Sequence, residues 1–183
     1  MAMAMAGTGS GRNIGVAVDF SSCSKNALRW AAANLAAPGD RLILIHVKTS
    51  YQYEQGVAHL WEHDGSPLIP LVELSDPRVG NIYGVAPDGE TMEVLARAAA
   101  ERGVHVLAKV MWGDPGRKLT EAVHKVPLQW LVVGNRGLST VKRVLMGSVS
   151  TYVVNHAACP VTVVRENKQN MLPLPSALTM PTT

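Results

Sequence analysis

The sequence of 183 residues has only two cysteines, Cys23 and Cys159. They lie far apart, and two such residues have neither the spacing of metal ligands nor the number needed for a disulfide framework. We therefore expect two reduced and partly buried thiols.

Charged and aromatic residues are also scarce. Charged side chains make up 17% of the sequence, the formal net charge is +3, and phenylalanine occurs once. A charge this small and this scattered argues against nucleic-acid binding. The hydrophobic fraction of 47% is typical of a globular chain, so Val, Leu, Ile and Ala must build the core. The length suits one well-buried domain.

No run of 18 apolar residues occurs, so we expect no transmembrane helix and no membrane partner. Residues 1–12 (MAMAMAGTGSGR) lack the basic start and the long apolar region of a signal peptide. We expect residues 1–12 and the proline-rich residues 166–183 to be flexible tails, and the chain to be cytoplasmic or also nuclear.

Between these tails, apolar runs alternate with helical patterns. We expect strands at 13–19, 41–47, 104–110, 129–133 and 160–164. Helical stripes with an i, i+3, i+4, i+7 spacing begin near Leu28, Met92, Leu119 and Val149. The runs 41–47 and 129–133 are apolar almost throughout, as in parallel strands that are covered on both faces. The alternation therefore predicts a doubly wound α/β fold for residues 13–165.

Residues 49–88 do not fit the alternation. They are rich in Gly, Pro and Asp and have no sustained period. We expect a long irregular insertion, and loops of this length are either functional or disordered.

Glycines and one aspartate are the candidates for a ligand site. The run VVGNRGLSTVKRVLMGSVS (132–150) places Gly134 at a strand end, Gly137 shortly after it, and Gly147 and Ser148 at the start of a helix. Glycine lets the backbone turn with φ > 0 and approach a ligand closely. A helix start offers free N–H groups to a phosphate, and Asp19, at the end of the first strand, could accept hydrogen bonds from a ribose. Three turn glycines with a serine cap explain the same pattern without a ligand, and the spacing is not that of a P-loop.

Other polar residues have simpler explanations. Ser21, Ser22 and Ser24 precede a helical stripe and are expected to be caps rather than nucleophiles. His59, His63 and Asp64 do not complete a metal ligand set. We expect no metal there, and we interpret His46 as a histidine of the core or of a strand end.

The spacing G-x2-G-x9-G-[S/T] resembles the nucleotide-binding signature of the universal stress protein family. Residues 17–31 (AVDFSSCSKNALRWA), 42–47 (LILIHV) and 159–165 (CPVTVVR) resemble its first strand and helix, its second strand and its last strand. The resemblance covers roughly residues 13–165 apart from the insertion. It implies a Rossmann-like sheet of five parallel strands in the order 3-2-1-4-5 with helices on both faces.

The resemblance also implies the site. The backbone of Ala17, Val18 and Val47 would border the adenine, and Asp19 would hold the ribose. The phosphates would be surrounded by Gly134, Arg136, Gly137, Gly147, Ser148, Val149 and Ser150. The ligand would be ATP or AMP, and Mg²⁺ would accompany ATP.

Three functions follow as alternatives. The first is a regulatory adenine-nucleotide-binding protein of the stress response, which is not an efficient enzyme. The second is a slow ATPase or phosphotransferase, although no catalytic base can be named. The third is a dimeric stress scaffold that does not bind nucleotide.

The segment 160–164 (PVTVV), from Pro160 to Val164, carries no charge and would lie at the sheet edge, so we expect a homodimer through it.

Overall fold

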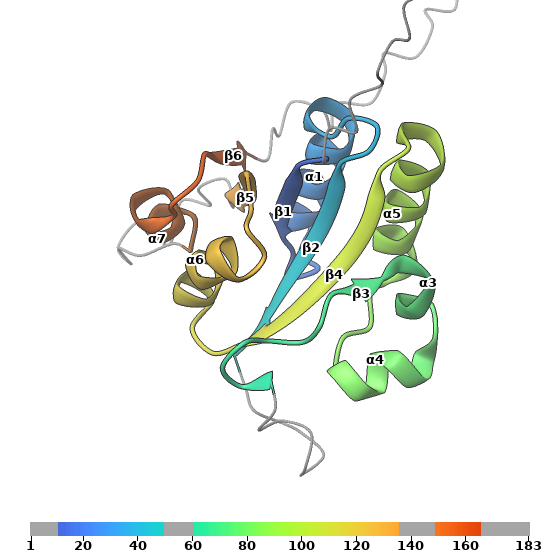
Figure 1. Ribbon diagram of the computed structural model, residues 1–183, viewed down its shortest axis with the longest axis horizontal. Helices are drawn as coiled ribbons and strands as arrows, with labels where there is room; N and C mark the ends of the chain where they lie inside the picture. Colours follow the sequence, from blue (N-terminus) through green and yellow to red (C-terminus); the bar gives the residue numbers. More distant parts are fainter. Residues whose placement is uncertain (1–10, 50–60, 136–148, 166–183) are drawn as a thin grey trace, which may run out of the picture.

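The computed structural model describes residues 11–49, 61–135 and 149–165 (Figure 1). These residues form a mixed sheet in the order β3-β4-β2-β1-β5-β6. The strands are β1 (Asn13–Ala17), β2 (Arg41–Lys48), β3 (Ile69–Pro70), β4 (His105–Trp112), β5 (Trp130–Asn135) and β6 (Val161–Arg165). All five predicted strands are present, run parallel and lie in the predicted order. The predicted fold class is therefore confirmed, with one more strand than expected.

The additional strand corrects the prediction of an irregular insertion. From residue 61 onward the insertion contains β3, which pairs antiparallel with β4, and the short helices α3 (Leu71–Leu74) and α4 (Pro77–Tyr83). Ser66 attaches the segment to the sheet, because its N–H donates to the carbonyl of Val110 at 2.8 Å and its Oγ accepts the Val110 N–H at 2.9 Å. These elements are too short to produce a visible period in the sequence. Residues 50–60 lie outside the described residues.

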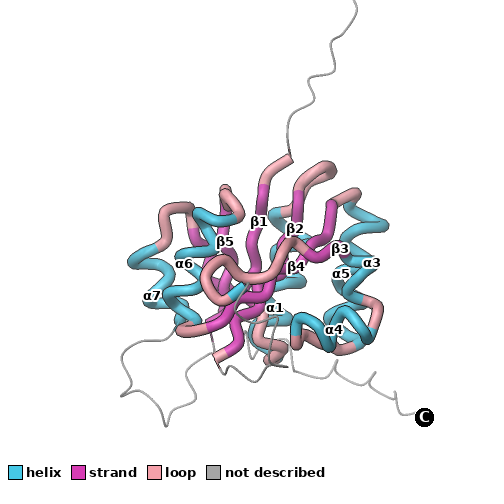
Figure 2. The backbone as a smooth tube through the Cα atoms, turned by 60° about the horizontal axis from the view of Figure 1, so that its bottom comes forward, coloured by secondary structure: helices cyan, strands magenta, loops and turns pink. Residues whose placement is uncertain are grey.

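The longer helices form two layers around the sheet (Figures 1 and 2). They are α1 (Ser22–Trp30), which continues as the π-helical turn η1 (Ala31–Leu35), α5 (Gly89–Arg102), α6 (Pro115–Lys125) and α7 (Val149–His156). Helices α1 and α5 pack on one face, and α6 and α7 pack on the other. Ser21 caps α1 by accepting the Ser24 N–H, as the sequence predicted.

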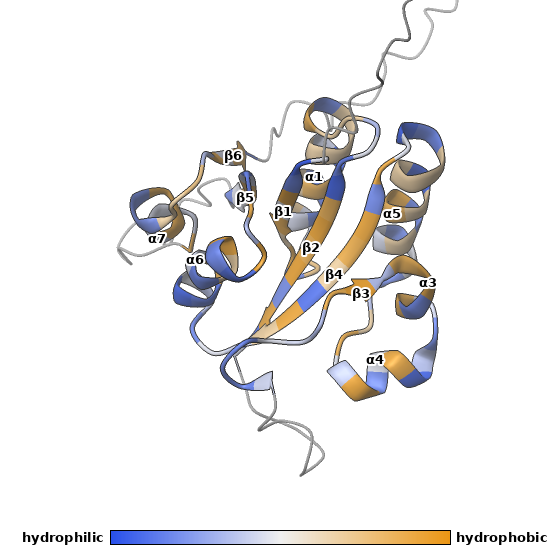
Figure 3. Ribbon diagram, viewed as in Figure 1, coloured by the Kyte–Doolittle hydropathy of each residue, from blue (hydrophilic) through white to orange (hydrophobic). Residues whose placement is uncertain are grey.

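Alternate residues of the central strands enter two separate cores. In β2, Leu42 and Leu44 pack toward α1 and α5, whereas Ile43 and Ile45 pack toward α6 and α7. The central strands are accordingly apolar along most of their length (Figure 3). This confirms that the uninterrupted apolar runs mark strands buried on both faces.

Two other expectations concern the thiols and the membrane. Cys23 and Cys159 are both free thiols, Cys23 being buried and Cys159 partly buried. Burial raises the pKa of Cys159 above its ordinary value. No helix within the described ranges is long and apolar enough to cross a membrane.

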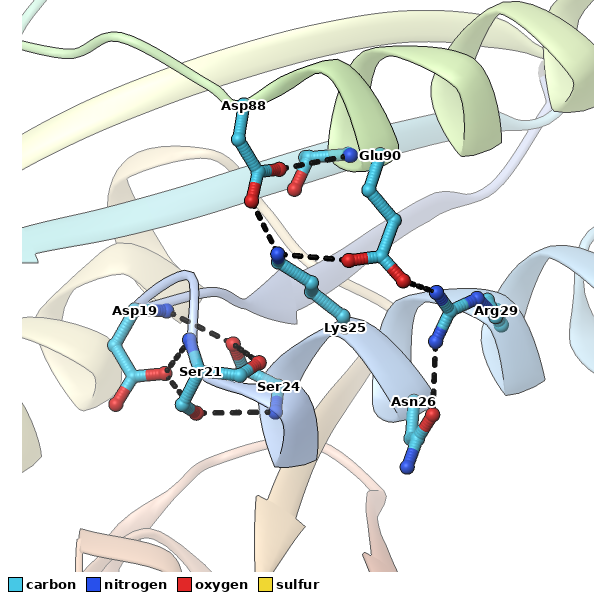
Figure 4. Close-up of polar contacts among 9 residues, drawn as sticks. Asp19, Ser21, Ser24, Lys25, Asn26, Arg29, Asp88 and Glu90 are labelled. Atoms are coloured by element: carbon cyan, nitrogen blue, oxygen red, sulfur yellow. Dashed lines mark hydrogen bonds and ion pairs between the residues drawn. The ribbon is translucent and has the colours of Figure 1, made fainter.

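A charged cluster joins α1 to the start of α5 (Figure 4). Lys25 of α1 binds the carboxylates of Asp88 and Glu90, and Arg29 binds Glu90 as well. The hydrogen bond from Lys25, with others from Thr91, lowers the pKa of Asp88 to about 2. The Asp88 side chain also caps α5 by accepting the Thr91 N–H at 2.9 Å.

Asp88→Asn is expected to make stability less dependent on pH, because asparagine keeps the cap but loses the charge. The folded-state pKa of Asp88 lies below the ordinary value of 3.8, so its stabilising contribution is present above about pH 3.8 and is lost as the pH falls toward 2. Urea unfolding at about pH 6 and about pH 2.5 should give a smaller difference for the variant than for the wild type. Glu73→Gln, which removes an exposed carboxylate of α3, is the control. An identical pH dependence in wild type and Asp88→Asn would contradict this account.

Candidate functional site

A cavity of about 350 Å³ lies beyond the carboxyl ends of β1, β2 and β5, between the starts of α1, α6 and α7. Ligands of open α/β sheets bind at this position, where neighbouring connections leave the sheet in opposite directions. The lining residues are Ala17, Val18, Asp19, Ser21, Cys23, Ser24, Ile45, Val47, Thr49, Pro115, Leu119, Val133, Gly134, Val149 and Ser150.

The cavity brings together seven of the eleven predicted site residues. These are Ala17, Val18, Asp19, Val47, Gly134, Val149 and Ser150, which come from four separate segments of the chain. The remaining four, Arg136, Gly137, Gly147 and Ser148, lie outside the described residues. The predicted contact of each residue with adenine, ribose or phosphate stays a prediction.

A network of hydrogen bonds shapes the polar wall of the cavity (Figure 4). The carboxylate of Asp19 accepts hydrogen bonds from the N–H of Ser21, at 3.1 Å, and from its hydroxyl. The N–H of Asp19 donates to the Ser24 hydroxyl at 3.2 Å. Asp19 is exposed although its backbone is anchored in this way. Its carboxylate can therefore accept further hydrogen bonds from a ligand.

Phe20, the residue between Asp19 and Ser21, has a left-handed backbone with φ of 63°. It is the only non-glycine residue with positive φ in the part of the chain that the structure describes. A bulky residue in this conformation costs about 1–3 kcal/mol and persists only where its surroundings enforce it. Its ring packs against His46, with the ring centroids 4.8 Å apart. Burial lowers the pKa of His46 below its ordinary value, so the imidazole is neutral near neutral pH.

Most of the other lining residues of the cavity are apolar, and we call them its apolar wall. Val18, Ile45 and Val47 line it from the sheet, and Pro115 and Leu119 line it from α6. A planar ring with a polar group at one end matches such a cavity, because the ring can contact the aliphatic side chains while the polar group meets Asp19 and the serines.

The sequence predicts a helical stripe that begins near Leu119 but no part for this helix in the site. Leu119 lies in a helical stripe, and nothing in the sequence distinguishes the residue that faces the cavity from those that face the sheet. Ser21 and Ser24 were predicted as helix caps, and the structure adds that they also line the cavity.

The structure changes the reason for glycine at position 134. The sequence predicts a turn with positive φ, but Gly134 is not among the glycines with positive φ. It lies in β5 against the first turn of α1, where a Cβ atom would be 2.8 Å from both the carbonyl oxygen and the Sγ of Cys23. Glycine is therefore required here for the close approach of α1 to the sheet.

The described residues include no group of three or more metal-ligating side chains. His63 lies 2.9 Å from the carboxylate of Asp64, and Lys125 binds the same carboxylate. The lysine lowers the pKa of Asp64 to about 2. His59 lies outside the described residues.

Among the described lining residues of the cavity, the only ionisable side chains are Asp19 and Cys23. A composition with so few ionisable groups is suited to binding a polar ring system.

Comparisons with a family model, with related sequences and with a solved structure all point to one protein family. A model of the "Universal stress protein family" matches residues 11–165. The universal stress protein PHOS32 of Arabidopsis thaliana is 30% identical over 183 residues, covering 91% of this chain and 70% of that protein. PHOS34 of the same plant is 32% identical, covering 86% of this chain and 63% of that protein. The crystal structure of a universal stress protein family protein from Arabidopsis thaliana with AMP bound has a TM-score of 0.55 at 24% identity, covering 88% and 95% of the two chains.

Proposed function

Because the chain belongs to the universal stress protein family, we propose that the cavity beside Asp19 binds an adenine nucleotide. The observation that carries this proposal is the convergence of five chain segments on one cavity with an apolar wall and an exposed carboxylate. The adenine would lie between Val47 and Leu119, and the ribose hydroxyls would donate to Asp19. The phosphates would then extend toward Ser150 at the start of α7, where helix N–H groups favour negative charge.

The proposed role is regulatory, in the cytosol or the nucleus, with ATP or AMP as the ligand. AMP is the first ligand to test, since a related protein of the same fold was crystallised with it. If the ligand is ATP, Mg²⁺ would accompany it. Hydrolysis would require a group that orients water and a metal that offsets the phosphate charge.

The proposal also includes a homodimer formed through β6. This strand lies at one edge of the sheet and is only partly buried. Its sequence VTVVR carries one charge, at its last residue, Arg165. An edge of this kind readily pairs with another strand.

The direct test is to denature the purified protein and to identify any nucleotide that it releases. Released ATP would indicate binding without turnover, and released AMP or ADP would lead to an assay of hydrolysis. Titration calorimetry with AMP and ATP would then give the affinities. No released nucleotide and no heat of binding would contradict the proposal and favour the scaffold.

Asp19→Ala is expected to weaken AMP binding about tenfold, equivalent to ~1.4 kcal/mol, because the lost hydrogen bonds are made by ribose hydroxyls to a charged acceptor. Binding of 2′,3′-dideoxy-AMP, which lacks these hydroxyls, should change little. Titration calorimetry with both ligands measures the difference.

Asp76→Ala is a matched control for this variant. Asp76 also accepts the N–H of the residue two positions later, at 2.9 Å, but it lies at the start of α4 and does not line the cavity. Equal losses of affinity for the two ligands in Asp19→Ala would indicate that Asp19 acts on the fold rather than on the ribose.

A further inference from the structure

We infer that His46 is a positioning residue that holds Asp19 at the cavity through the residues on both sides of it. The inference rests on the proposed function, because Asp19 is the predicted ribose ligand. His46 itself does not line the cavity, although its neighbours Ile45 and Val47 do. It acts therefore through other residues rather than by touching the ligand.

The first link runs from His46 to the residue before Asp19. The Nδ1 atom of His46 lies 2.8 Å from the carbonyl oxygen of Val18, so the tautomer protonated at Nδ1 donates to it. The N–H of Val18 donates to the carbonyl of Ile45 at 2.9 Å. The peptide groups on either side of Val18 are thus both fixed to β2, immediately before the chain reaches Asp19.

The second link runs from His46 to the residue after Asp19. The imidazole packs against the Phe20 ring at a centroid distance of 4.8 Å and an interplanar angle of 41°. Phe20 is the residue with φ of 63°, a conformation that a phenylalanine does not adopt unless other contacts hold it there. The aromatic contact supplies such a hold, since glycine or asparagine would otherwise be favoured at this position.

These two links define the direction of the Asp19 side chain. A left-handed residue reverses the course of the backbone, which brings the Ser21 N–H within 3.1 Å of the Asp19 carboxylate and begins α1. If Phe20 relaxed to an extended conformation, Asp19 and the Ser21 cap could not keep this arrangement.

The charged groups near His46 are Asp19 and Lys48. Asp19 raises the pKa of the imidazole and Lys48 lowers it, so their effects oppose each other.

Three variants separate the two links. His46→Asn keeps a hydrogen-bond donor near the Nδ1 position but removes the ring, His46→Phe keeps a ring but removes the donor, and His46→Leu removes both. We expect the Kd for AMP to rise about fivefold in each of the first two variants and about tenfold in His46→Leu, which is the full loss expected for Asp19→Ala. The Kd for 2′,3′-dideoxy-AMP should change less than about twofold, because its binding does not use Asp19.

Two further measurements distinguish positioning from general destabilisation. In an Asp19→Ala background, His46→Leu should cause no additional loss of AMP affinity, since the two residues act through one contact. His105→Leu, which changes an exposed histidine at the amino end of the neighbouring strand β4, is the matched control and should bind both ligands like the wild type. Thermal unfolding identifies the variants that are folded, and His46→Asn is the mildest of the three.

The outcomes separate the inference from the proposed function. If wild type binds AMP and the folded His46 variants bind it equally well, or lose AMP and 2′,3′-dideoxy-AMP equally, the positioning role is wrong while the proposed function stands. If wild type binds neither AMP nor ATP, both are wrong. A loss confined to the ribonucleotide and absent in the Asp19→Ala background supports the inference.

Discussion

Replacing Gly134 with valine is expected to weaken AMP binding at least 100-fold, equivalent to about 2.7 kcal/mol, and to destabilise the fold by about 1–3 kcal/mol. An added Cβ would be 2.8 Å from the Cys23 carbonyl oxygen and 3.0 Å from its carbonyl carbon. Backbone atoms cannot rotate away as a side chain can, so the first turn of α1 must move. That turn carries Ser21 and Ser24, which line the cavity beside Asp19.

Calorimetric titration and urea unfolding measure the two effects of Gly134→Val separately. Gly89→Ala is the control, because a Cβ at this exposed residue of α5 would meet nothing within 4 Å. Cys23→Ala should not rescue the Gly134 variant, since two of the three close contacts are with backbone atoms. If a folded Gly134→Val protein bound AMP with wild-type affinity, the contact between α1 and β5 would have no role in shaping the site.

Val163→Pro is expected to convert the predicted homodimer into a monomer at micromolar concentration without unfolding the chain. The Leu131 N–H donates to the Pro160 carbonyl at 3.0 Å, so by alternation residues 160, 162 and 164 bond to β5. The N–H of Val163 consequently faces away from the sheet, where a second β6 strand would pair with it. Proline removes this donor and leaves the bonds to β5 in place.

Light scattering gives the oligomeric state of the Val163→Pro variant. Val163→Ala keeps the N–H and is the matched control for the loss of side-chain volume, so it should remain dimeric. Helix α7, next to β6, leaves 52% of Val154 exposed, which would add apolar contact area to such an interface. A wild-type monomer at micromolar concentration, or a fully dimeric proline variant, would exclude pairing through β6.

The sequence predicts the sheet well because burial on both faces leaves a direct record in it. Parallel strands such as β2 are apolar along most of their length, and the helices between them keep their period and their caps. The insertion left no such record. The two-residue strand β3 is defined by its pairing with β4 and by the hydrogen bond between Ser66 and Val110. The β4 residues lie far from the insertion in the sequence. Contacts of this kind are tertiary and have no local pattern.

The same distinction applies to the site. Asp19 and Gly134 could be identified from their places at strand ends, since topology alone brings these ends together. Whether Leu119 lines the cavity depends on the rotation of α6 about its axis. The left-handed conformation of Phe20 depends on its contact with His46, which is distant in the sequence. For Gly134 the sequence predicts a turn that approaches a ligand, whereas the structure shows that glycine is required by the steric contact with Cys23.

The two-residue strand β3 makes the two edges of the sheet differ in how readily they can pair with another strand. A sheet whose outer strands are both long and open can add copies at each side and grow without limit. Here β3 covers part of the β4 edge, Pro70 has no N–H to offer, and the chain turns at once into α3. Recruitment of a further strand is thereby disfavoured on that side. A two-fold contact through β6 would pair the other edge of the sheet. The assembly would then end at two copies and would not continue into a fibre.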